Sequence, residues 1–170
     1  MNDELALQGK PGEPVIQVIG LRKLFRTGRA GLFWGKEQVV RAVDGVSFSL
    51  APAEVLALVG ESGCGKSTLA LTLMGLEKPT EGEILFEGNS IRDLDAAGLK
   101  ALRRKIQMVF QDPYESLNPT QTVEEIVLEP LHVHKLGGGA EEQTKRVRLA
   151  LEDVGLVPAD NYFKRYPHEL

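Results

Sequence analysis

The segment from Gly60 to Thr68 constrains the fold more than any other part of the chain. It reads Gly-Glu-Ser-Gly-Cys-Gly-Lys-Ser-Thr and fits G-x-x-x-x-G-K-[ST], the pattern of a phosphate-binding loop. The apolar run 55–59 before it predicts a buried strand, and the run 69–74 after it predicts a helix that ends at Gly75. A strand, a glycine-rich loop and a helix form the context that this motif needs. The alternative is a glycine-rich turn that caps an ordinary helix, and the matching flanks argue against it.

The backbone of this loop is suited to an anion. Gly60, Gly63 and Gly65 lack a Cβ, so the chain can adopt positive φ there and come close to a ligand. The N–H groups of residues 62–67 can then converge on a negative charge, and the helix that begins near Gly65 adds the positive end of its dipole. The loop is therefore predicted to bind phosphate.

Three side chains of the loop have predicted roles. Lys66 is placed to contact the β- and γ-phosphates, Ser67 to ligate Mg²⁺, and Thr68 to donate a hydrogen bond to an α-phosphate. Cys64 is either a reactive thiol at a helix N-terminus or a small filler between glycines. The residues predicted to contact the nucleotide are Gly60, Glu61, Ser62, Gly63, Cys64, Gly65, Lys66, Ser67 and Thr68.

Composition excludes several classes of protein. The 170 residues suffice for one domain with a sizeable core, and 42% hydrophobic and 26% charged residues are ordinary for a soluble globular protein. A net charge of −4 argues against bulk nucleic-acid binding, and the single cysteine excludes an internal disulfide and a cysteine metal cluster. The longest apolar run, 55–59, is far too short to cross a membrane, and no apolar signal core follows the N-terminus. We expect a soluble cytoplasmic protein that reaches a membrane only through a partner.

The order of patterns along the chain predicts an α/β fold. A loose tail over 1–14 precedes several β patterns, and helical patterns dominate the second half. The predicted strands are 15–21, 39–50 (strand, turn at Asp44-Gly45, strand), 55–59, 84–86 and 106–110, with a loop or hairpin insertion at 27–37. The predicted helices are 69–74, 95–104 with Asp95 as N-cap, 122–132 and 141–154. An antiparallel β layer, then an α/β core, then a helical part is the expected arrangement.

Three further stretches, taken with the loop, resemble the ATP-binding subunit of an ABC transporter. Residues 107–119, Gln-Met-Val-Phe-Gln-Asp-Pro-Tyr-Glu-Ser-Leu-Asn-Pro, are similar to the Q-loop of these proteins, and the Ser-Leu-Asn-Pro tail is typical of the di- and oligopeptide importer subgroup. Residues 39–48 are similar to the β segment ahead of the phosphate loop, and Tyr-Pro-His-Glu-Leu at 166–170 runs into the signature sequence in the family. The resemblance covers 15–170. It implies a P-loop NTPase core with an N-terminal antiparallel β subdomain and the start of a helical subdomain at 120–170.

The resemblance also implies cofactors and site residues. ATP and Mg²⁺ are the expected ligands, and Lys66 and Gln111 are the expected catalytic residues. Gln111 matches the Q-loop glutamine, which approaches Mg²⁺ or the attacking water. Without the resemblance it would be a surface amide at a strand end. Phe25 matches an aromatic residue that stacks on adenine, and the alternative is a core phenylalanine on a strand.

The resemblance implies partners as well. These are integral-membrane permease subunits and a second nucleotide-binding subunit, identical or different, that closes the ATP sandwich. The expected location is therefore cytoplasmic, at the inner face of the cell membrane through the permease, without direct membrane insertion and without nucleic acid. The transported substrate is expected to be a peptide, although nickel importers share the same motifs.

Several family features do not occur in the 170 residues. There is no Ser-Gly-Gly-Gln string, and the run Leu149–Asp153, which imitates the acidic metal-binding strand, lies in a helical pattern. His132, His134 and His168 are expected to be structural or exposed, because none stands where the family has its switch histidine. The sequence thus predicts an incomplete domain that binds nucleotide but hydrolyses little by itself. It also predicts an exposed apolar sheet edge beside 55–59 and 106–110.

Two other functions stay open from the residues alone. One is a different P-loop enzyme, such as a GTPase or a small kinase, although the Asn-Lys-x-Asp motif by which GTPases read their base does not occur. The other is a non-hydrolytic nucleotide-binding fragment or interaction module.

Overall fold

The computed structural model describes residues 14–27, 38–112 and 116–170. The tail predicted over 1–14 and the insertion predicted at 27–37 therefore lie almost wholly outside the described residues. The chain divides into two compact units, one up to Gln107 and one from Met108 to Leu170. Each unit is described by itself.

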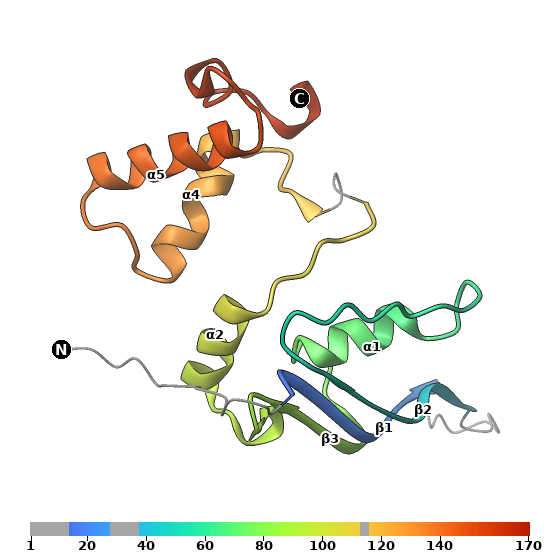
Figure 1. Ribbon diagram of the computed structural model, residues 1–170. Coiled ribbons are helices and arrows are strands. Elements are labelled where there is room, and N and C mark those ends of the chain that lie inside the picture. The colour runs from blue at the N-terminus through green and yellow to red at the C-terminus, as the bar shows by residue number, and fades with distance from the viewer. Residues whose placement is uncertain (1–13, 28–37, 113–115) are drawn as a thin grey trace, which may run out of the picture. The chain divides into compact units, whose positions relative to one another are not determined.

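The first unit contains a four-stranded antiparallel sheet (Figure 1). Its strands are β1 (Ile16–Thr27), β2 (Gln38–Leu50), β3 (Glu81–Phe86) and the short β4 (Asn89–Ser90), in the order β2-β1-β3-β4. β1 is central, pairing with β2 from Ile16↔Leu50 to Thr27↔Gln38 and with β3 from Ile16↔Phe86 to Arg22↔Glu81. The antiparallel β layer expected from the sequence is confirmed.

One detail of this sheet differs from the prediction. Residues 39–50 form a single strand, not two strands joined by a turn at Asp44-Gly45. Gly45 does have a positive φ of 72°, but the pairing of β2 with β1 continues on both sides of it with shifts in register. The Asp-Gly pair therefore marks an irregularity inside a strand, where glycine tolerates the local distortion.

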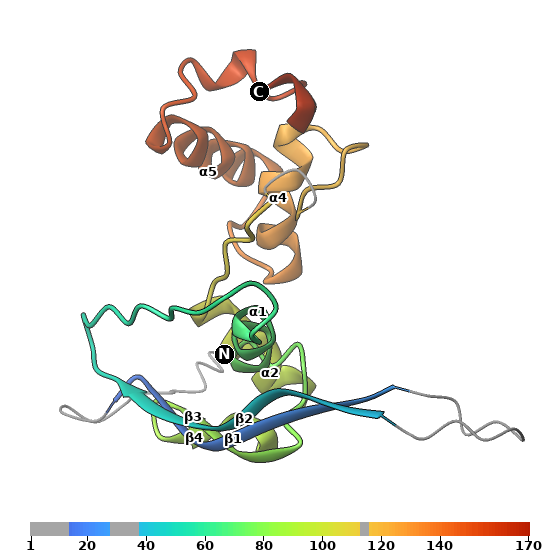
Figure 2. The same ribbon diagram turned by 90° about the vertical axis from the view of Figure 1, so that its right-hand side faces the viewer.

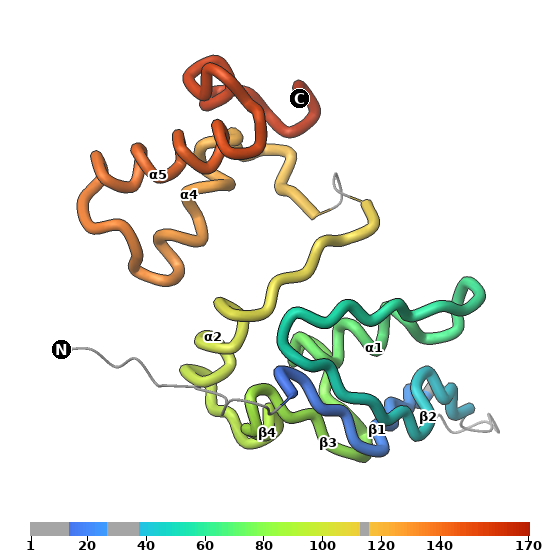
Figure 3. The backbone as a smooth tube through the Cα atoms, in the orientation of Figure 1, coloured from blue at the N-terminus to red at the C-terminus, as the bar shows by residue number. Residues whose placement is uncertain are grey.

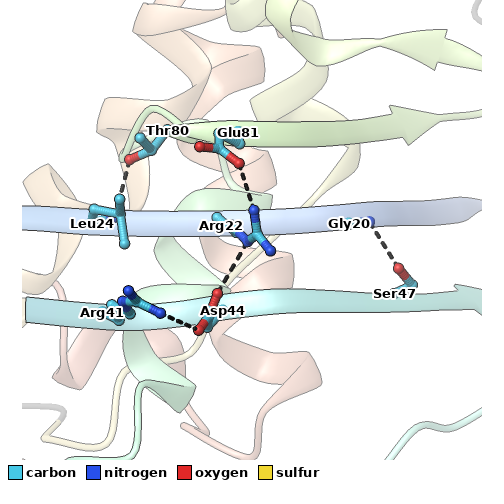
Figure 4. A network of polar contacts seen from close by, with 8 residues as sticks. All are labelled: Gly20, Arg22, Leu24, Arg41, Asp44, Ser47, Thr80 and Glu81. Carbon is cyan, nitrogen blue, oxygen red and sulfur yellow. Dashed lines mark hydrogen bonds and ion pairs between the residues drawn. The ribbon is translucent and has the colours of Figure 1, made fainter.

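A polar network ties the three main strands together (Figure 4). Arg22 on β1 lies between Glu81 on β3, at 2.8 Å, and Asp44 on β2, at 3.0 Å. The hydrogen bond and charge of Glu81, followed by those of Asp44, raise the pKa of Arg22 above its ordinary value. Since all three side chains are about half exposed, the network fixes register more than it adds stability.

Two helices cover one face of the sheet, α1 (Lys66–Leu73) and α2 (Ala96–Lys105), as Figures 1 and 2 show. A 3₁₀ turn at Ile91–Asp93 precedes α2, and Asp95 caps it by accepting a hydrogen bond from Gly98 N at 2.8 Å, as predicted. The core lies between helices and sheet. Its buried side chains are Val18, Leu21, Val43, Leu69, Ile84, Phe86, Ile91 and Leu102.

Two predicted buried strands are wrong. Residues 55–59 and 106–110 form no strand, and the run 55–59 is an extended segment without a partner strand (Figure 3). Val55 and Val59 are 93% and 91% exposed, and Val109 is 95% exposed. A strand that is buried on both faces needs neighbouring strands for its backbone groups, and none of β1 to β4 pairs with either run. The sequence analysis also predicted an exposed apolar sheet edge beside these two runs. Apolar side chains are exposed in both runs, but neither run pairs with a strand of the sheet.

The second unit is helical. It contains α4 (Val123–Val133), α5 (Ala140–Asp153) and two 3₁₀ turns at Ala159–Asn161 and Pro167–Glu169. The helices predicted at 122–132 and 141–154 are thus confirmed within a residue, and the acidic run 149–153 ends a helix. Its buried core residues are Val123, Val147, Leu151, Ala159 and Phe163. In the described part of the chain, no helix is long and apolar enough to span a membrane.

The start of α4 is closed by a reciprocal capping box. The Thr122 hydroxyl accepts from Glu125 N at 3.3 Å, and Thr122 N donates to the Glu125 carboxylate at 2.8 Å. The backbone hydrogen bond from Thr122, together with the bond from its hydroxyl, lowers the pKa of Glu125 below its ordinary value.

Hydrogen exchange tests the unpaired segment. We expect the amides of residues 55–59 to exchange far faster than those of β1, because they lack strand partners. Exchange followed by mass spectrometry or NMR provides the measurement. Protection of 55–59 comparable to that of β1 would show that the segment is paired.

The capping box predicts a pH dependence of stability. Because the folded pKa of Glu125 is lowered, its stabilisation is complete above the ordinary value of 4.5 and is lost as pH falls through the folded pKa. Glu125→Gln should therefore reduce the loss of unfolding free energy on acidification, measured by urea titration with far-UV circular dichroism. Glu124→Gln, in the same helical turn but outside the capping box, is the matched control. An equal effect of both substitutions would contradict the assignment.

Candidate functional site

The predicted phosphate loop leads directly into α1 in the first unit. Gly63 and Gly65 both have positive φ, 79° and 97°, a backbone conformation that residues with a Cβ rarely adopt. Gly65 is the N-cap of α1, and its carbonyl accepts the first helical hydrogen bond from Leu69 N at 2.8 Å. The positive φ predicted from the motif is thus confirmed at Gly63 and Gly65 and is wrong at Gly60.

Gly65 also lies against the sheet. A Cβ at this position would be 1.9 Å from the carbonyl oxygen of Ala42, which is on β2. A Cβ at Gly60 would be 2.6 Å from the Sγ of Cys64, whereas at Gly63 it would meet nothing within 4 Å. Gly65 therefore serves close packing as well as backbone conformation. No residue pattern indicates the role of Ala42, because its backbone carbonyl and not its side chain takes part.

Lys66 folds back over the loop. Its Nζ donates to the carbonyl oxygens of Gly60 at 2.7 Å and Glu61 at 2.6 Å, and it lies 3.5 Å from the Sγ of Cys64. Among the residues that the structure describes, no carboxylate forms an ion pair with Lys66. Its positive charge is therefore held within the loop by neutral carbonyls and is available to an anion.

The N-terminus of α1 adds further positive potential. No side chain caps the helix, and its first turn contains no acidic residue. Ser67 and Thr68 stand at the second and third helical positions, with Ser67 exposed and Thr68 partly buried. Uncapped N–H groups at a helix start, together with the macrodipole, form a ready site for an anion.

A cavity of about 200 Å³ lies beside the loop. Its walls come from β2, the segment before the loop, the loop itself and α1: Ala42, Val43, Asp44, Val46, Leu58, Val59, Cys64, Gly65, Lys66 and Leu69. Small-molecule pockets usually measure about 300–1,000 Å³, so most of a nucleotide bound at the loop would remain outside this cavity.

Phe25 lies on β1, opposite Val40 of β2. Its side chain is 36% exposed and does not belong to the buried core, so the alternative of a core phenylalanine is wrong. Val40 stands two residues before Ala42, the residue whose carbonyl meets Gly65. The Lys23 ammonium lies 4.8 Å from the centroid of the Phe25 ring, a contact that the sequence analysis missed.

Gln111 is exposed and belongs to the second unit, whereas the phosphate loop belongs to the first. Its predicted approach to Mg²⁺ or water therefore stays a prediction. Residues 113–115 of the Q-loop region lie outside the described residues.

Among the described residues no cluster of acidic, histidine or cysteine side chains could hold a metal ion by itself. His132 pairs with Gln143 at 3.1 Å, and His168 stacks on Tyr166.

Comparison with known proteins decides between the remaining families. A family model described as "ABC transporter" matches residues 43–170, which include the loop, the Q-loop region and the helical unit. The chain belongs to the ABC transporter family. The GTPase and kinase alternatives are thereby excluded, and the fold predicted from the resemblance is confirmed.

The chain is also similar to curated proteins that are named as ATP-binding proteins of import and transport systems. It is 50% identical to the glutathione import ATP-binding protein GsiA of Salmonella paratyphi A, over 93% of this chain and 25% of that protein. It is 48% identical to the oligopeptide transport ATP-binding protein AppF of Bacillus subtilis, over 92% of this chain and 47% of that protein. The chain thus spans about a quarter to a half of the length of these relatives.

Solved structures agree with the ABC fold. The dimeric ATP-binding cassette MJ0796 bound to ADP and Pi matches with a TM-score of 0.73 at 30% identity, over 91% of this chain and 62% of that chain. The cbiO1 protein of Clostridium perfringens, part of the cbiONQ transporter complex, matches with a TM-score of 0.66 at 28% identity, over 92% and 55% of the two chains.

Two glycine substitutions separate backbone strain from packing. Gly63→Ala should cost about 1–2 kcal/mol of unfolding free energy, because only the positive φ is penalised. Gly65→Ala should cost clearly more, since the new Cβ also collides with the carbonyl of Ala42. Urea unfolding of both variants measures the difference, and equal losses would show that the contact with β2 does not constrain the loop.

Proposed function

We propose that this chain binds MgATP as the nucleotide-binding part of an ABC importer. The observation that carries the proposal is the position of Lys66, whose ammonium lies within a glycine loop at the uncapped N-terminus of α1. A triphosphate offers the multiple negative charges that this arrangement favours. Family membership and the ATP-binding relatives support ATP as the nucleotide.

The loop residues have distinct roles in this proposal. Lys66 leaves the carbonyls of Gly60 and Glu61 to contact the β- and γ-phosphates, and the backbone N–H groups of the loop surround the same phosphates. The Ser67 hydroxyl ligates Mg²⁺, which its exposure permits. Gln111, from the second unit, is proposed to reach Mg²⁺ or the attacking water. When bound, Mg²⁺ would supply positive charge that offsets the negative charge of the phosphates.

Phe25 is proposed to stack on the adenine. Its ring is partly exposed on β1 and is not needed by the core. It stands opposite Val40, close along β2 to the point where that strand meets the loop. Stacking of a base on an aromatic ring typically contributes about 1–3 kcal/mol.

The importer itself is proposed to carry di- or oligopeptides. The relatives are named for glutathione and oligopeptide import, and glutathione is itself a small peptide. The chain would work at the cytoplasmic face of the membrane, bound to permease subunits and to a second nucleotide-binding subunit. The dimeric state of MJ0796 supports the last of these partners. Since the 170 residues contain no Ser-Gly-Gly-Gln string, we propose that they bind ATP without rapid turnover when studied alone.

Loss of the loop lysine tests the binding claim. Lys66→Met should weaken MgATP affinity by about 10- to 100-fold, because a charge-assisted hydrogen bond contributes about 1.5–3 kcal/mol. Isothermal titration calorimetry measures the affinity. Lys100→Met, which removes an equal charge from an exposed position of α2, should leave it unchanged. If folded protein does not bind MgATP at millimolar concentration, the alternative of a non-nucleotide interaction module gains and the proposal fails.

A further inference from the structure

The side chain of Lys23 is unusually enclosed for a lysine on an open sheet. It is 12% exposed, and its ammonium lies 4.8 Å from the centroid of the Phe25 ring. A cation at this distance from an aromatic face is attracted by the negative potential of the ring. Lys23 therefore faces the residue proposed to hold the base.

The ammonium of Lys23 is also fixed from the other side. It donates to the Glu77 carboxylate at 2.6 Å and to the carbonyl oxygen of Lys78 at 3.0 Å. Glu77 N in turn donates to the carbonyl of Leu71, in the last turn of α1, at 3.2 Å. The cation beside Phe25 is thus attached to the C-terminal end of the helix whose N-terminal end forms the phosphate loop.

A second link holds the same segment against β1. Thr80 N donates to the carbonyl of Arg22 at 2.8 Å. Leu24 N donates to the Thr80 hydroxyl at 3.0 Å, as Figure 4 shows. The residues on either side of Lys23 are therefore fixed to the segment that follows α1. This restricts where the Lys23 ammonium can lie and, with it, the position of the Phe25 ring.

We propose that Lys23 is a positioning residue for the nucleobase. The Lys23 ammonium, which Glu77 holds in place, lies over one face of the Phe25 ring. This contact fixes the ring in the orientation in which a purine can stack on it. This inference rests on the proposed role of Phe25 and extends it. It assigns to Lys23 and Glu77 a part in base affinity, although neither contacts the nucleotide.

The test compares a ligand with a base and one without. MgATP and magnesium tripolyphosphate are titrated by calorimetry into the 170-residue chain and its variants. Lys23→Met keeps the aliphatic stem and removes the charge, and Lys23→Arg keeps a cation. We expect Lys23→Met to weaken MgATP binding by about three- to tenfold and to leave tripolyphosphate binding unchanged, with Lys23→Arg close to the unsubstituted chain.

A double-mutant cycle locates the effect at the ring. Phe25→Ala should weaken MgATP but not tripolyphosphate, and adding Lys23→Met to it should cost nothing further. If far-UV circular dichroism shows that Lys23→Met does not fold, Glu77→Gln replaces it in the test. This substitution removes the carboxylate that holds the Lys23 ammonium and keeps the ammonium itself. It is also expected to weaken MgATP selectively.

The outcomes separate the two proposals. If Phe25→Ala leaves MgATP affinity unchanged, base stacking fails and the role of Lys23 fails with it. If Phe25→Ala weakens MgATP but Lys23→Met and Glu77→Gln do not, the proposed function stands and the inference is overturned. The inference is equally overturned if loss of the Lys23 charge weakens both ligands alike, since Lys23 would then only support the fold.

Discussion

The close approach of Gly65 to the carbonyl of Ala42 is the constraint on which the rest of the first unit depends. It fixes the start of α1 against β2 at a distance that only glycine allows. From that point α1 runs over the sheet, where Leu69 joins the core formed with Val43 and its neighbours. The same contact determines where Lys66 and the free N–H groups of the helix lie. The packing of α1 on the sheet and the placement of the anion-binding groups therefore share one backbone contact.

Prediction from sequence succeeded where a signal is local. The helices α2 and α4 begin directly after Asp95 and Thr122, within a residue of the predicted starts, because a cap is formed by residues that are neighbours in the chain. The glycine pattern likewise gave the loop, since positive φ at Gly63 and Gly65 is a property of the residues themselves. The resemblance supplied the family, which local patterns alone left open.

Prediction failed where structure depends on partners far along the chain. The run 55–59 has the composition of a buried strand, but composition does not provide the neighbouring strands on which such a strand relies. Asp44-Gly45 has the composition of a hairpin turn, yet the pairing of β2 with β1 carries the strand through it. The contacts of Ala42 with Gly65 and of Lys23 with Glu77 join segments that are far apart in the chain, without a sequence motif. Only the folded chain reveals them.

The two carbonyls that accept hydrogen bonds from Lys66 compete with an anion for its ammonium. An incoming anion has to replace both hydrogen bonds before it gains contact with the ammonium. A singly charged ion gains too little from this exchange, whereas a chain of phosphates also engages the helix N-terminus and offsets the loss. The loop is thus expected to favour ligands of high charge density over singly charged ions.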